Sequence, residues 1–258
     1  MSPNAATEEE GGWALFLDVD GTILEIAETP ESVYVPESLK QLLTELCLRV
    51  DGALALVSGR SLKNLDHLFS PLRFCGSGVH GCERRMAAGC TFRPELDGGL
   101  LANVGSSLAD FARSHRGLLF EDKGCGFAMH FRRVPELYPL ALATVKAAQE
   151  RLGPEFMVQL GNKALELRPS AWSKGTAVSA FMREIPFRGR TAVYIGGDDT
   201  DEDAFAAVNA LGGISIRVGA SSATLARYRM AGVGEVVNWL QTVPSITPGG
   251  FRECMRTT

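Results

Sequence analysis

The sequence lacks the features that direct a protein to a membrane, to secretion or to nucleic acid. No apolar run approaches the roughly 18 residues that a membrane span needs. The first twelve residues carry three glutamates and no basic residue, so they do not resemble a signal peptide. With 26 basic against 30 acidic residues, the formal charge of −4 gives no broad attraction to polyanions. We therefore expect neither a nucleic-acid nor a membrane partner.

The sequence also lacks the cysteine and histidine patterns of structural metal sites. Its six cysteines are scattered and form no C-x-x-C pair, which argues against a zinc site and a disulfide scaffold. The spacing of the histidines does not suggest zinc either, and we interpret His67, His115 and His130 as structural. This cysteine usage fits a reducing compartment, and we expect a cytoplasmic protein.

The composition is that of an ordinary globular protein. Apolar residues make up 45% and charged residues 22% of the 258 positions, which excludes collagen-like, coiled-coil and disordered chains. At about 150 residues per domain, this length suits one large domain or two small ones.

Both ends of the chain favour one α/β domain. Short continuous apolar runs are typical of strands buried on both faces of a sheet, and helical patterns lie between them. This alternation predicts a doubly wound parallel sheet. The expected strands are 13–17, 53–57, 74–79, 191–195 and 214–218, and the expected helices are 36–48, 61–68, 176–185, 201–211 and 220–230.

The middle of the chain predicts a smaller α+β module inserted into that domain. Its expected strands are 91–94, 118–121, 126–132, 156–160 and 164–167, and its expected helices are 100–114 and 135–152. The resulting division gives a core of 12–84 and 171–243, an insert of 85–170, and flexible ends at 1–11 and 244–258.

Two carboxylates follow the first expected strand. Because a strand alternates its faces, Asp18 and Asp20 can project to the same side, and Gly21 allows the chain to turn away. An aspartate in such a place can attack phosphorus, its neighbour can transfer protons, and a divalent cation can relieve their repulsion. The competing interpretation is a strand that ends in a simple Asx turn.

Two further segments could hold a phosphate group. Ser58-Gly59-Arg60 follows the second expected strand, where a hydroxyl and a backbone N–H can bind phosphate oxygens, although Ser58 could also be a helix N-cap. Lys174 lies at the start of a helix, where its ammonium could neutralise both an aspartate and a phosphoryl group. A lone lysine is more often a solvated surface residue.

An acidic cluster follows the strand expected at 191–195. Five of the six residues at 198–203 are acidic, and their mutual repulsion favours a bound cation. Helix capping could account for one or two of these acids, but not for all of them.

Taken in order, these four motifs resemble those of the haloacid-dehalogenase (HAD) superfamily of phosphotransferases. The resemblance implies a Rossmann-like core with Asp18 as nucleophile and Asp20 as acid/base. It also implies that Ser58 and Lys174 bind phosphate, with Gly59 beside them, and that the acidic cluster belongs to a Mg²⁺ site.

Finer features are similar to the trehalose-6-phosphate phosphatase family. They are 57–60 (VSGR), 78–83 (GVHGCE), 121–124 (EDKG), 129–132 (MHFR), 165–169 (LELRP), 172–175 (WSKG) and 200–205 (TDEDAF). The resemblance implies that the insert is a C2-type cap that closes over the sugar. The substrate-binding residues that it implies are Arg60, His80, Glu121, Lys123 and Glu166.

The cap residues have a simpler interpretation as well. Glu121 and Lys123 could form an exposed charge pair on one strand face, and Glu166 could be a solvent-facing strand residue. His80 could be a turn residue whose ring is satisfied by backbone groups.

One departure from the family pattern concerns the metal loop. The family usually reads Gly-Asp-Asp-x-Thr-Asp-Glu, whereas this sequence has Gly197 at the position of the first aspartate. We expect Asp18, Asp20 and Asp198 to hold the metal ion, supported by Asp199 and Asp201.

The resemblance implies a Mg²⁺-dependent phosphatase that hydrolyses the sugar phosphate trehalose 6-phosphate. We expect the protein to be a monomer. Two alternatives stay open: another sugar phosphatase of the superfamily, for example one acting on sucrose 6-phosphate, and a non-catalytic sugar-phosphate sensor. The presence of Asp18, Asp20 and Lys174 argues against a sensor, whereas Gly197 weakly favours one.

Overall fold

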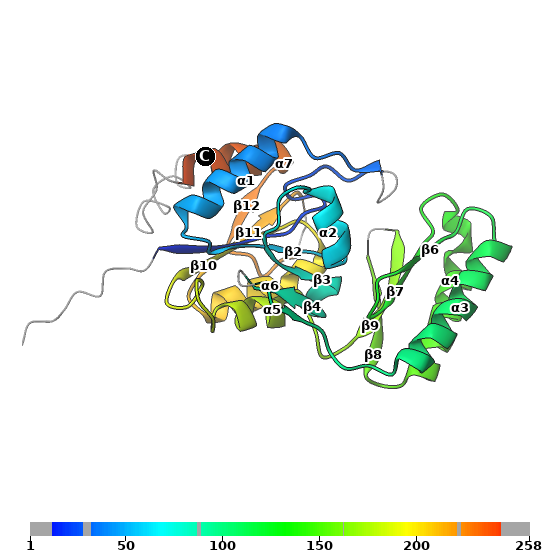
Figure 1. Ribbon diagram of the computed structural model, residues 1–258. Coiled ribbons are helices and arrows are strands. Elements are labelled where there is room, and N and C mark those ends of the chain that lie inside the picture. The colour runs from blue at the N-terminus through cyan, green and yellow to red at the C-terminus, as the bar shows by residue number, and fades with distance from the viewer. Residues whose placement is uncertain (1–11, 28–31, 87–88, 162, 221–222, 244–258) are drawn as a thin grey trace, which may run out of the picture.

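The structure is a computed structural model that describes residues 12–27, 32–86, 89–161, 163–220 and 223–243. The expectations for residues 1–11 and 244–258 lie outside these described residues. Two separate sheets organise the chain, each with helices packed on it (Figure 1). No helix in this part of the chain combines the length and apolar content needed to cross a membrane.

The larger sheet has eight strands among the described residues, in the order β12-β11-β10-β1-β2-β3-β4-β5. The strands from β12 to β3 are parallel, whereas β4 and β5 continue the sheet in antiparallel pairs. Their bounds are β1 Trp13–Leu17, β2 Leu54–Val57, β3 Cys75–Gly78, β4 Glu83–Arg85, β5 Thr91–Phe92, β10 Thr191–Gly196, β11 Ile214–Val218 and β12 Tyr228–Met230.

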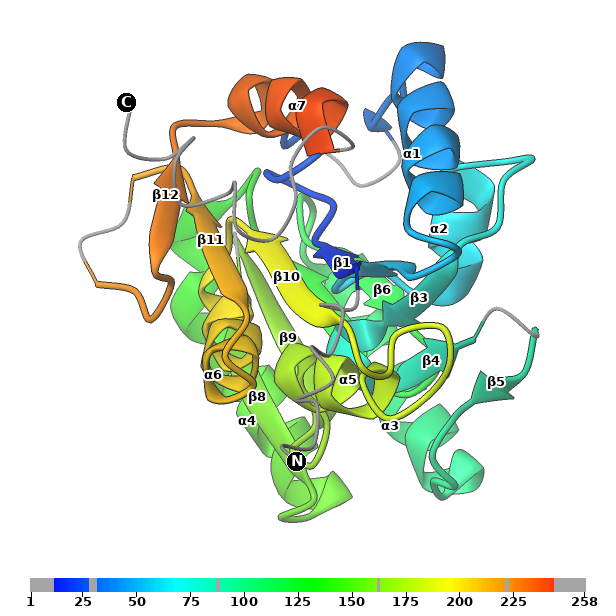
Figure 2. The same cartoon turned by 90° about the vertical axis from the view of Figure 1, so that its left-hand side faces the viewer.

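Helices cover both faces of this sheet. Helices α1 and α7 are in contact on one face, and α5 and α6 are in contact on the other (Figures 1 and 2). The helices of this part are α1 Glu37–Arg49, α2 Leu62–Leu68, α5 Lys174–Phe181, α6 Glu202–Ala210 and α7 Val233–Thr242. The α/β class with a doubly wound, largely parallel sheet is thereby confirmed.

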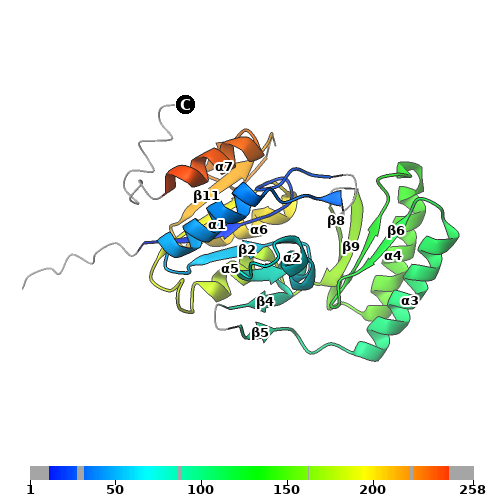
Figure 3. The same cartoon turned by 45° about the horizontal axis from the view of Figure 1, so that its top comes forward.

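The smaller sheet is antiparallel, in the order β6-β7-β9-β8. Helices α3 and α4 pack on its outer face, away from the larger sheet (Figure 3). We call residues 98–169 the cap; its elements are α3 Gly98–Ser114, β6 Leu119–Asp122, β7 Phe127–His130, α4 Tyr138–Leu152, β8 Phe156–Leu160 and β9 Ala164–Pro169.

Each sheet has its own hydrophobic core. In the larger part, the rings of Phe16, Phe181 and Phe187 pack together under the sheet, with centroids 5.0–5.9 Å apart. In the cap, residues such as Val104 on α3 and Leu167 on β9 are fully buried in a second cluster. A third, small buried cluster brings Val79 and Cys82 of the larger part together with Cys125 of the cap.

Most expected elements lie within a few residues of those observed, but two differ. The helix expected at 220–230 is wrong, because Tyr228–Met230 form the edge strand β12 and pair with β11. The backbone hydrogen bonds to β11 stabilise an extended conformation here. The apolar spacing that predicted the helix is weak and does not outweigh them. The strand expected in the insert at 91–94 is β5, which pairs with β4 in the larger sheet. The domain limits near residues 85 and 170 stay predictions.

Candidate active site

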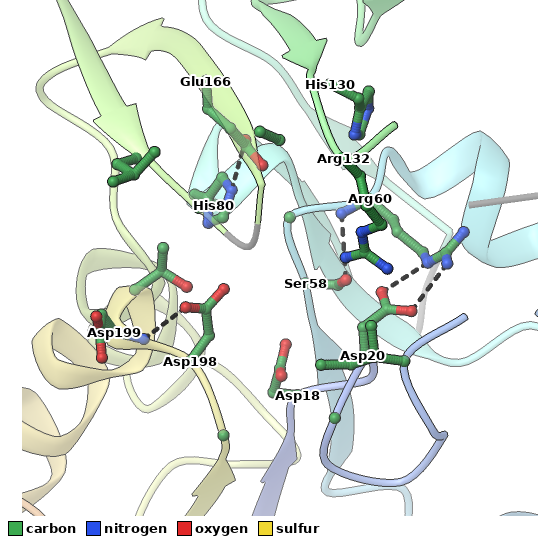
Figure 4. A pocket seen from close by; sticks show the side chains of 18 of the residues that line it. Asp18, Asp20, Ser58, Arg60, His80, His130, Arg132, Glu166, Asp198 and Asp199 are labelled. Carbon is green, nitrogen blue, oxygen red and sulfur yellow. Dashed lines mark hydrogen bonds and ion pairs between the residues drawn. The ribbon is translucent and has the colours of Figure 1, made fainter. Parts of the chain in front are cut away.

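A cavity of about 960 Å³ lies between the carboxyl ends of the parallel strands and the cap. Open α/β sheets bind ligands at this edge, where several strands deliver their following residues to one place. Figure 4 shows side chains from both parts pointing into the cavity. The expected residues that line it are Asp18, Asp20, Ser58, Gly59, Arg60, His80, Glu121, Lys123, Glu166, Lys174, Asp198 and Asp199.

Asp18 follows β1 directly and is only 3% exposed. Its Oδ1 accepts a hydrogen bond from Lys174 Nζ at 2.8 Å, and its Oδ2 accepts one from Thr22 Oγ1 at 3.0 Å. Burial, together with the negative charge of Asp201, raises the pKa of Asp18 to about 7, although Lys174 opposes the rise. The carboxyl group is therefore fixed in position, and its surroundings disfavour its negative charge despite the contact with Lys174.

Lys174 is a buried residue and not a solvated one. It is the first residue of α5, whose N-cap Ser173 forms a capping box with Thr176. Its Nζ donates to Asp18 Oδ1 at 2.8 Å and to Asp201 Oδ1 at 2.6 Å. Although burial disfavours the charged form, these two carboxylates raise the pKa of Lys174, so the ammonium stays charged.

Asp201 lies behind Lys174 and does not line the cavity. It is fully buried and accepts hydrogen bonds from Lys174, from the Tyr194 hydroxyl at 2.6 Å and from the Asp198 N–H at 2.8 Å. Burial and the carboxylate of Asp201 raise the pKa of Tyr194, which therefore stays a donor. Asp201 thus holds the ammonium and the acidic loop in position, and its support of a metal ion stays a prediction.

Asp20 lies two residues beyond Asp18, at the rim of the same cavity. Its two carboxylate oxygens accept from Arg60 Nε at 2.7 Å and from Arg60 Nη2 at 2.8 Å (Figure 4). The third guanidinium nitrogen, Nη1, donates to Asn64 Oδ1 at 2.7 Å. Arg60 lines the cavity, and its guanidinium forms a two-pronged contact with Asp20, which is a candidate catalytic residue.

Ser58 lies at the end of β2 and is 1% exposed. The N-cap of α2 is Ser61, which accepts from the Asn64 N–H, so the capping interpretation of Ser58 is wrong. Its hydroxyl accepts from the Arg60 N–H at 3.2 Å and faces the cavity (Figure 4). At Gly59, a Cβ would lie 2.6 Å from His80 Nε2, so only glycine fits there.

The acidic loop presents Asp198 and Asp199 to the cavity. Asp198 is half-buried, its Oδ1 accepts from the Asp199 N–H at 2.6 Å, and its carbonyl accepts from Arg217 Nη1 at 3.0 Å. Asp199 is exposed and pairs with Arg217 at 3.1 Å. A Cβ at Gly197 would lie 2.8 Å from the Gly21 carbonyl oxygen, so this loop packs directly against the turn after β1.

The donor set of this site fits a hard divalent cation. Asp18, Asp20 and Asp198 border one cavity, and the excess negative charge at Asp18 favours a nearby positive ion. In the described part of the chain, no three His, Cys, Asp or Glu side chains are gathered into a ready metal cage. Mg²⁺ usually takes only one or two carboxylates and completes its shell with water and phosphate oxygens, so the fit does not require one.

The cap contributes a buried charge network that reaches the core. Lys123 Nζ donates to the Gly59 carbonyl at 2.9 Å and to Glu166 Oε2 at 3.0 Å, and His80 Nε2 lies 2.7 Å from the same Glu166 oxygen. Burial favours the neutral acid, but Lys123 and His80 lower the pKa of Glu166 well below its usual range. The solvent-facing interpretation of Lys123 and Glu166 is therefore wrong.

His80 lies on a turn with unusual backbone geometry. The backbone φ angles of His80 and Val79 are 51° and 47°, in the left-handed region. This conformation is energetically unfavourable, most of all for a β-branched residue such as Val79. Burial lowers the pKa of His80, and Glu166 offsets this only in part. The ring is therefore neutral near pH 7, and such stored strain is typical of functional sites.

His130 is a cavity residue that we interpreted as structural from the sequence. Its Nε2 lies 2.9 Å from Glu121 Oε2. Although burial opposes the shift, this contact and Lys123 lower the pKa of Glu121. Strand register explains the grouping: Glu121 pairs with Ala128, and Ala128 pairs with Glu166. The alternation of 126–132 places His130 on the same face as Ala128, a signal that could have found it.

Other lining residues were also missed from the sequence. They are mainly apolar or basic side chains at the rim, namely Ile26, Leu119, Arg132, Arg133 and Leu160. Arg132 on the cap side donates to the Ala27 carbonyl in the loop after Asp20, which gives a further polar contact between the two parts.

The comparisons with known proteins agree with this geometry. The family model described as trehalose-phosphatase matches residues 16–233. A trehalose-6-phosphate phosphatase of Escherichia coli (strain K12) is 42% identical over 231 residues, which cover 90% of this chain and 86% of the relative.

Solved structures show the same fold. A trehalose-6-phosphate phosphatase related protein superposes with a TM-score of 0.77 at 25% identity, covering 90% of this chain and 96% of the other. A phosphatase of the haloalkanoate (HAD) superfamily from Bacteroides thetaiotaomicron has a TM-score of 0.58 at 14% identity, covering 95% and 99%, and shares the fold. By the family model and the identity to the bacterial relative, this chain belongs to the trehalose-phosphatase family.

Proposed function

We propose that this protein hydrolyses trehalose 6-phosphate to trehalose and inorganic phosphate through a phosphorylated Asp18. The observation that carries the proposal is the buried Asp18 carboxylate, held by Lys174 and Thr22 in a cavity that the cap residues Glu121, Lys123 and Glu166 also line. A phosphate site in the core and hydroxyl-reading groups on the cap suit a sugar phosphate. Family membership supports the same substrate.

In the first step, an oxygen of the Asp18 carboxylate attacks phosphorus, and the bond from phosphorus to the sugar oxygen breaks. Asp20 gives its proton to the departing oxygen, so trehalose leaves as a neutral alcohol. Lys174 keeps the carboxylate in place and balances the phosphoryl charge beside it, and the Ser58 hydroxyl donates to a phosphoryl oxygen. The product of this step is an acyl phosphate on Asp18.

In the second step, Asp20, now ionised, takes a proton from a water molecule as that water attacks phosphorus. The bond between phosphorus and the Asp18 oxygen breaks, phosphate leaves, and both carboxyl groups return to their starting states. One residue thus serves as acid and then as base, which suits its place at the rim, where it is a third exposed.

We propose that Asp18, Asp20 and Asp198 hold Mg²⁺ when the enzyme works, with Asp199 and Asp201 in support. The ion supplies charge stabilisation for the phosphoryl oxygens. Asp198 is the acid of its loop that both faces the cavity and is partly buried, which supports it in place of the aspartate that Gly197 replaces.

The cap supplies the sugar-reading groups in this proposal. Glu121 and Glu166 flank the small Ala128 on one sheet face, and Lys123 and His80 border the same space. Buried carboxylates and an ammonium that find hydroxyl partners only in the correct sugar reject substrates that lack them. The closed cap also keeps bulk water from the phosphorylated aspartate.

A phosphate-release assay on the purified protein tests the proposal. We expect release from trehalose 6-phosphate that requires Mg²⁺ and is lost with a chelator, with much slower release from glucose 6-phosphate and sucrose 6-phosphate. Preference for sucrose 6-phosphate or another sugar phosphate would support the phosphatase chemistry of the core but contradict the recognition of trehalose by the cap. Tight binding of trehalose 6-phosphate without release would identify a sensor.

A cytoplasmic location and a monomeric state are part of the same proposal. The five cysteines that the structure describes are free thiols, which supports a reducing compartment. Size-exclusion chromatography with light scattering tests the monomer.

A further inference from the structure

The contact between Arg60 and Asp20 defines a function for Arg60 that differs from substrate binding. Its guanidinium meets both oxygens of Asp20 in a bidentate fork, with distances of 2.7 and 2.8 Å. The Arg60 side chain is 8% exposed, whereas that of Asp20 is 34% exposed. The less mobile, more buried partner therefore orients the more exposed one.

Arg60 is itself fixed from several directions. Its Nη1 donates to Asn64 Oδ1 at 2.7 Å, and its backbone N–H donates to the Ser58 hydroxyl at 3.2 Å. Its carbonyl accepts from the Val79 N–H at 2.9 Å, at the strained turn that carries His80. The segment that holds the Arg60 fork therefore also presents Ser58 to the cavity. The positions of the Asp20 carboxylate and of the Ser58 hydroxyl depend on the same backbone.

Among the described residues, the hydrogen bonds that the Asp20 side chain accepts come from this fork, so Arg60 sets its direction at the cavity rim. It lies on the turn after β1, where Gly21 has a φ of 77° and the chain leaves the sheet. A carboxylate that must first give and later take a proton at one place has to keep one direction through both steps. When one Asp20 oxygen carries the proton, the other can still accept from Arg60.

We propose that Arg60 is a positioning residue that holds the Asp20 carboxylate in line with the sugar oxygen, and that it is not itself a ligand of the substrate. The inference rests on the proposed function, since it concerns the proton transfers of that reaction. Lysine cannot replace the fork, because its ammonium is a single point charge without planar geometry.

A double-mutant cycle tests the proposal. Steady-state hydrolysis of trehalose 6-phosphate is measured for the wild type, R60A, D20N and the R60A/D20N double variant. If Arg60 acts through Asp20, R60A should lower kcat on the order of 10²-fold, the lower range for general acid–base catalysis. KM should stay within about threefold of the wild-type value. In the D20N background, R60A should cause almost no further loss.

The opposite pattern would overturn the inference. If Arg60 binds the substrate, R60A raises KM, and its loss multiplies with that of D20N. R60K and Asn64→Ala supply milder changes in case R60A does not fold. Each should lower kcat and leave KM within about threefold of the wild type, and R60K, which keeps the charge without the fork, should not restore wild-type kcat. A KM effect in either variant would contradict the proposal.

Arg85 offers a matched control. It is equally buried and forms the same type of fork with Asp66 on α2, at 2.7 and 2.8 Å, but it lies outside the cavity. Arg85→Lys should lower stability and leave kcat and KM near wild-type values. A kcat loss like that of R60K would mean that loosening α2 lowers activity in general, whichever arginine is replaced. A wild type that releases no phosphate from trehalose 6-phosphate would refute the proposed function itself, which is a different outcome.

Discussion

Asp18 combines two properties that ordinary surface aspartates lack: it is buried, and it shares the single ammonium of Lys174 with Asp201. Two carboxylates around one cation leave an excess negative charge at the end of β1. This arrangement costs stability in the resting protein and is typical of a residue kept for reaction and not for folding.

Replacing Asp18 by Asn should abolish turnover while leaving the fold intact. The amide keeps the size of the side chain and can still accept from Lys174, but it cannot form the acyl phosphate. We expect kcat on trehalose 6-phosphate to fall on the order of 10⁴-fold or more, as for other lost nucleophiles. Asp51→Asn, at an exposed surface ion pair with Arg190, is the control and should retain full activity. Substantial turnover by Asp18→Asn would exclude Asp18 as the nucleophile.

Gly197 occupies a place where the family usually has an acid, but the structure leaves no room for one. The missing Cβ would lie 2.8 Å from the Gly21 carbonyl oxygen, which is backbone and cannot move aside cheaply. Gly197→Asp should therefore lower the free energy of unfolding by about 1–3 kcal/mol, the usual cost of overpacking. It should not lower the Mg²⁺ concentration needed for half-maximal activity.

Chemical unfolding and a Mg²⁺ titration measure these two effects. Gly234→Asp is the matched control, since Gly234 is exposed on α7 and has open space around its Cβ position. A stable Gly197→Asp variant with a lower Mg²⁺ requirement would show that the loop adjusts and that Asp198 is not the working ligand.

At the scale of elements, Lys123 connects the β6–β7 hairpin of the cap to residues 58–60 of the core. Its ammonium touches the Gly59 carbonyl and Glu166, and it is 7% exposed. Lys123→Met keeps the apolar stem but leaves Glu166 buried with one charge partner fewer. Breaking a buried ion pair costs about 3–5 kcal/mol. We expect this loss to weaken cap closure and sugar binding.

We therefore expect Lys123→Met to lower kcat/KM for trehalose 6-phosphate far more than for p-nitrophenyl phosphate, which has no sugar for the cap to read. Lys146→Met, on the exposed side of α4, serves as control and should change neither value. Equal losses on both substrates would contradict a cap function in sugar recognition.

The elements that deliver core residues could be predicted from the sequence, because each follows a short apolar run. Asp18, Ser58 and Asp198 all lie just beyond such runs, and the parallel order of the strands brings them together. The cap residues could be placed on strands but not beside one another, since register is a property of pairing. The row Glu121–Ala128–Glu166 is visible only in the folded sheet, although strand alternation alone places His130 on the same face as Ala128.

The error at 220–230 has the same origin. Met230 is buried and Tyr228 packs on the core, a period-two pattern that the sequence shows only over three residues. The free backbone edge of β11 decides the conformation there, and no local signal reports that this edge is available.

At the scale of the whole molecule, two separately packed parts meet around one cavity through a small apolar cluster of Val79, Cys82 and Cys125 and through several polar contacts. Lys123 to Gly59, His80 to Glu166 and Arg132 to Ala27 all cross from cap to core. Such contacts are strong when closed and can exchange with water when open, unlike a continuous apolar core. The stability of the closed form should therefore depend on the charge states of these groups.

His80 makes this dependence measurable through pH. Burial lowers its pKa below the ordinary 6.5, and Glu166 offsets this only in part while Lys123 and Lys174 add to it. Between the folded pKa and about 6.5, the unfolded chain binds a proton that the folded protein does not. The contribution of His80 to the free energy of unfolding is therefore present above pH 6.5 and is lost as the pH falls below it.

Chemical unfolding at pH 7.5, 6.5 and 5.5 in the wild type and in His80→Gln measures this contribution. Glutamine can still donate to Glu166 but does not titrate, so the difference in free energy of unfolding between wild type and variant should shrink as the pH falls. The lowered pKa of Glu166 acts only below its ordinary 4.5, outside this range. His67→Gln, at an exposed position on α2, should keep the wild-type pH dependence. A difference for His80→Gln that stays constant with pH would show that its ring is not held neutral by burial at the junction of cap and core.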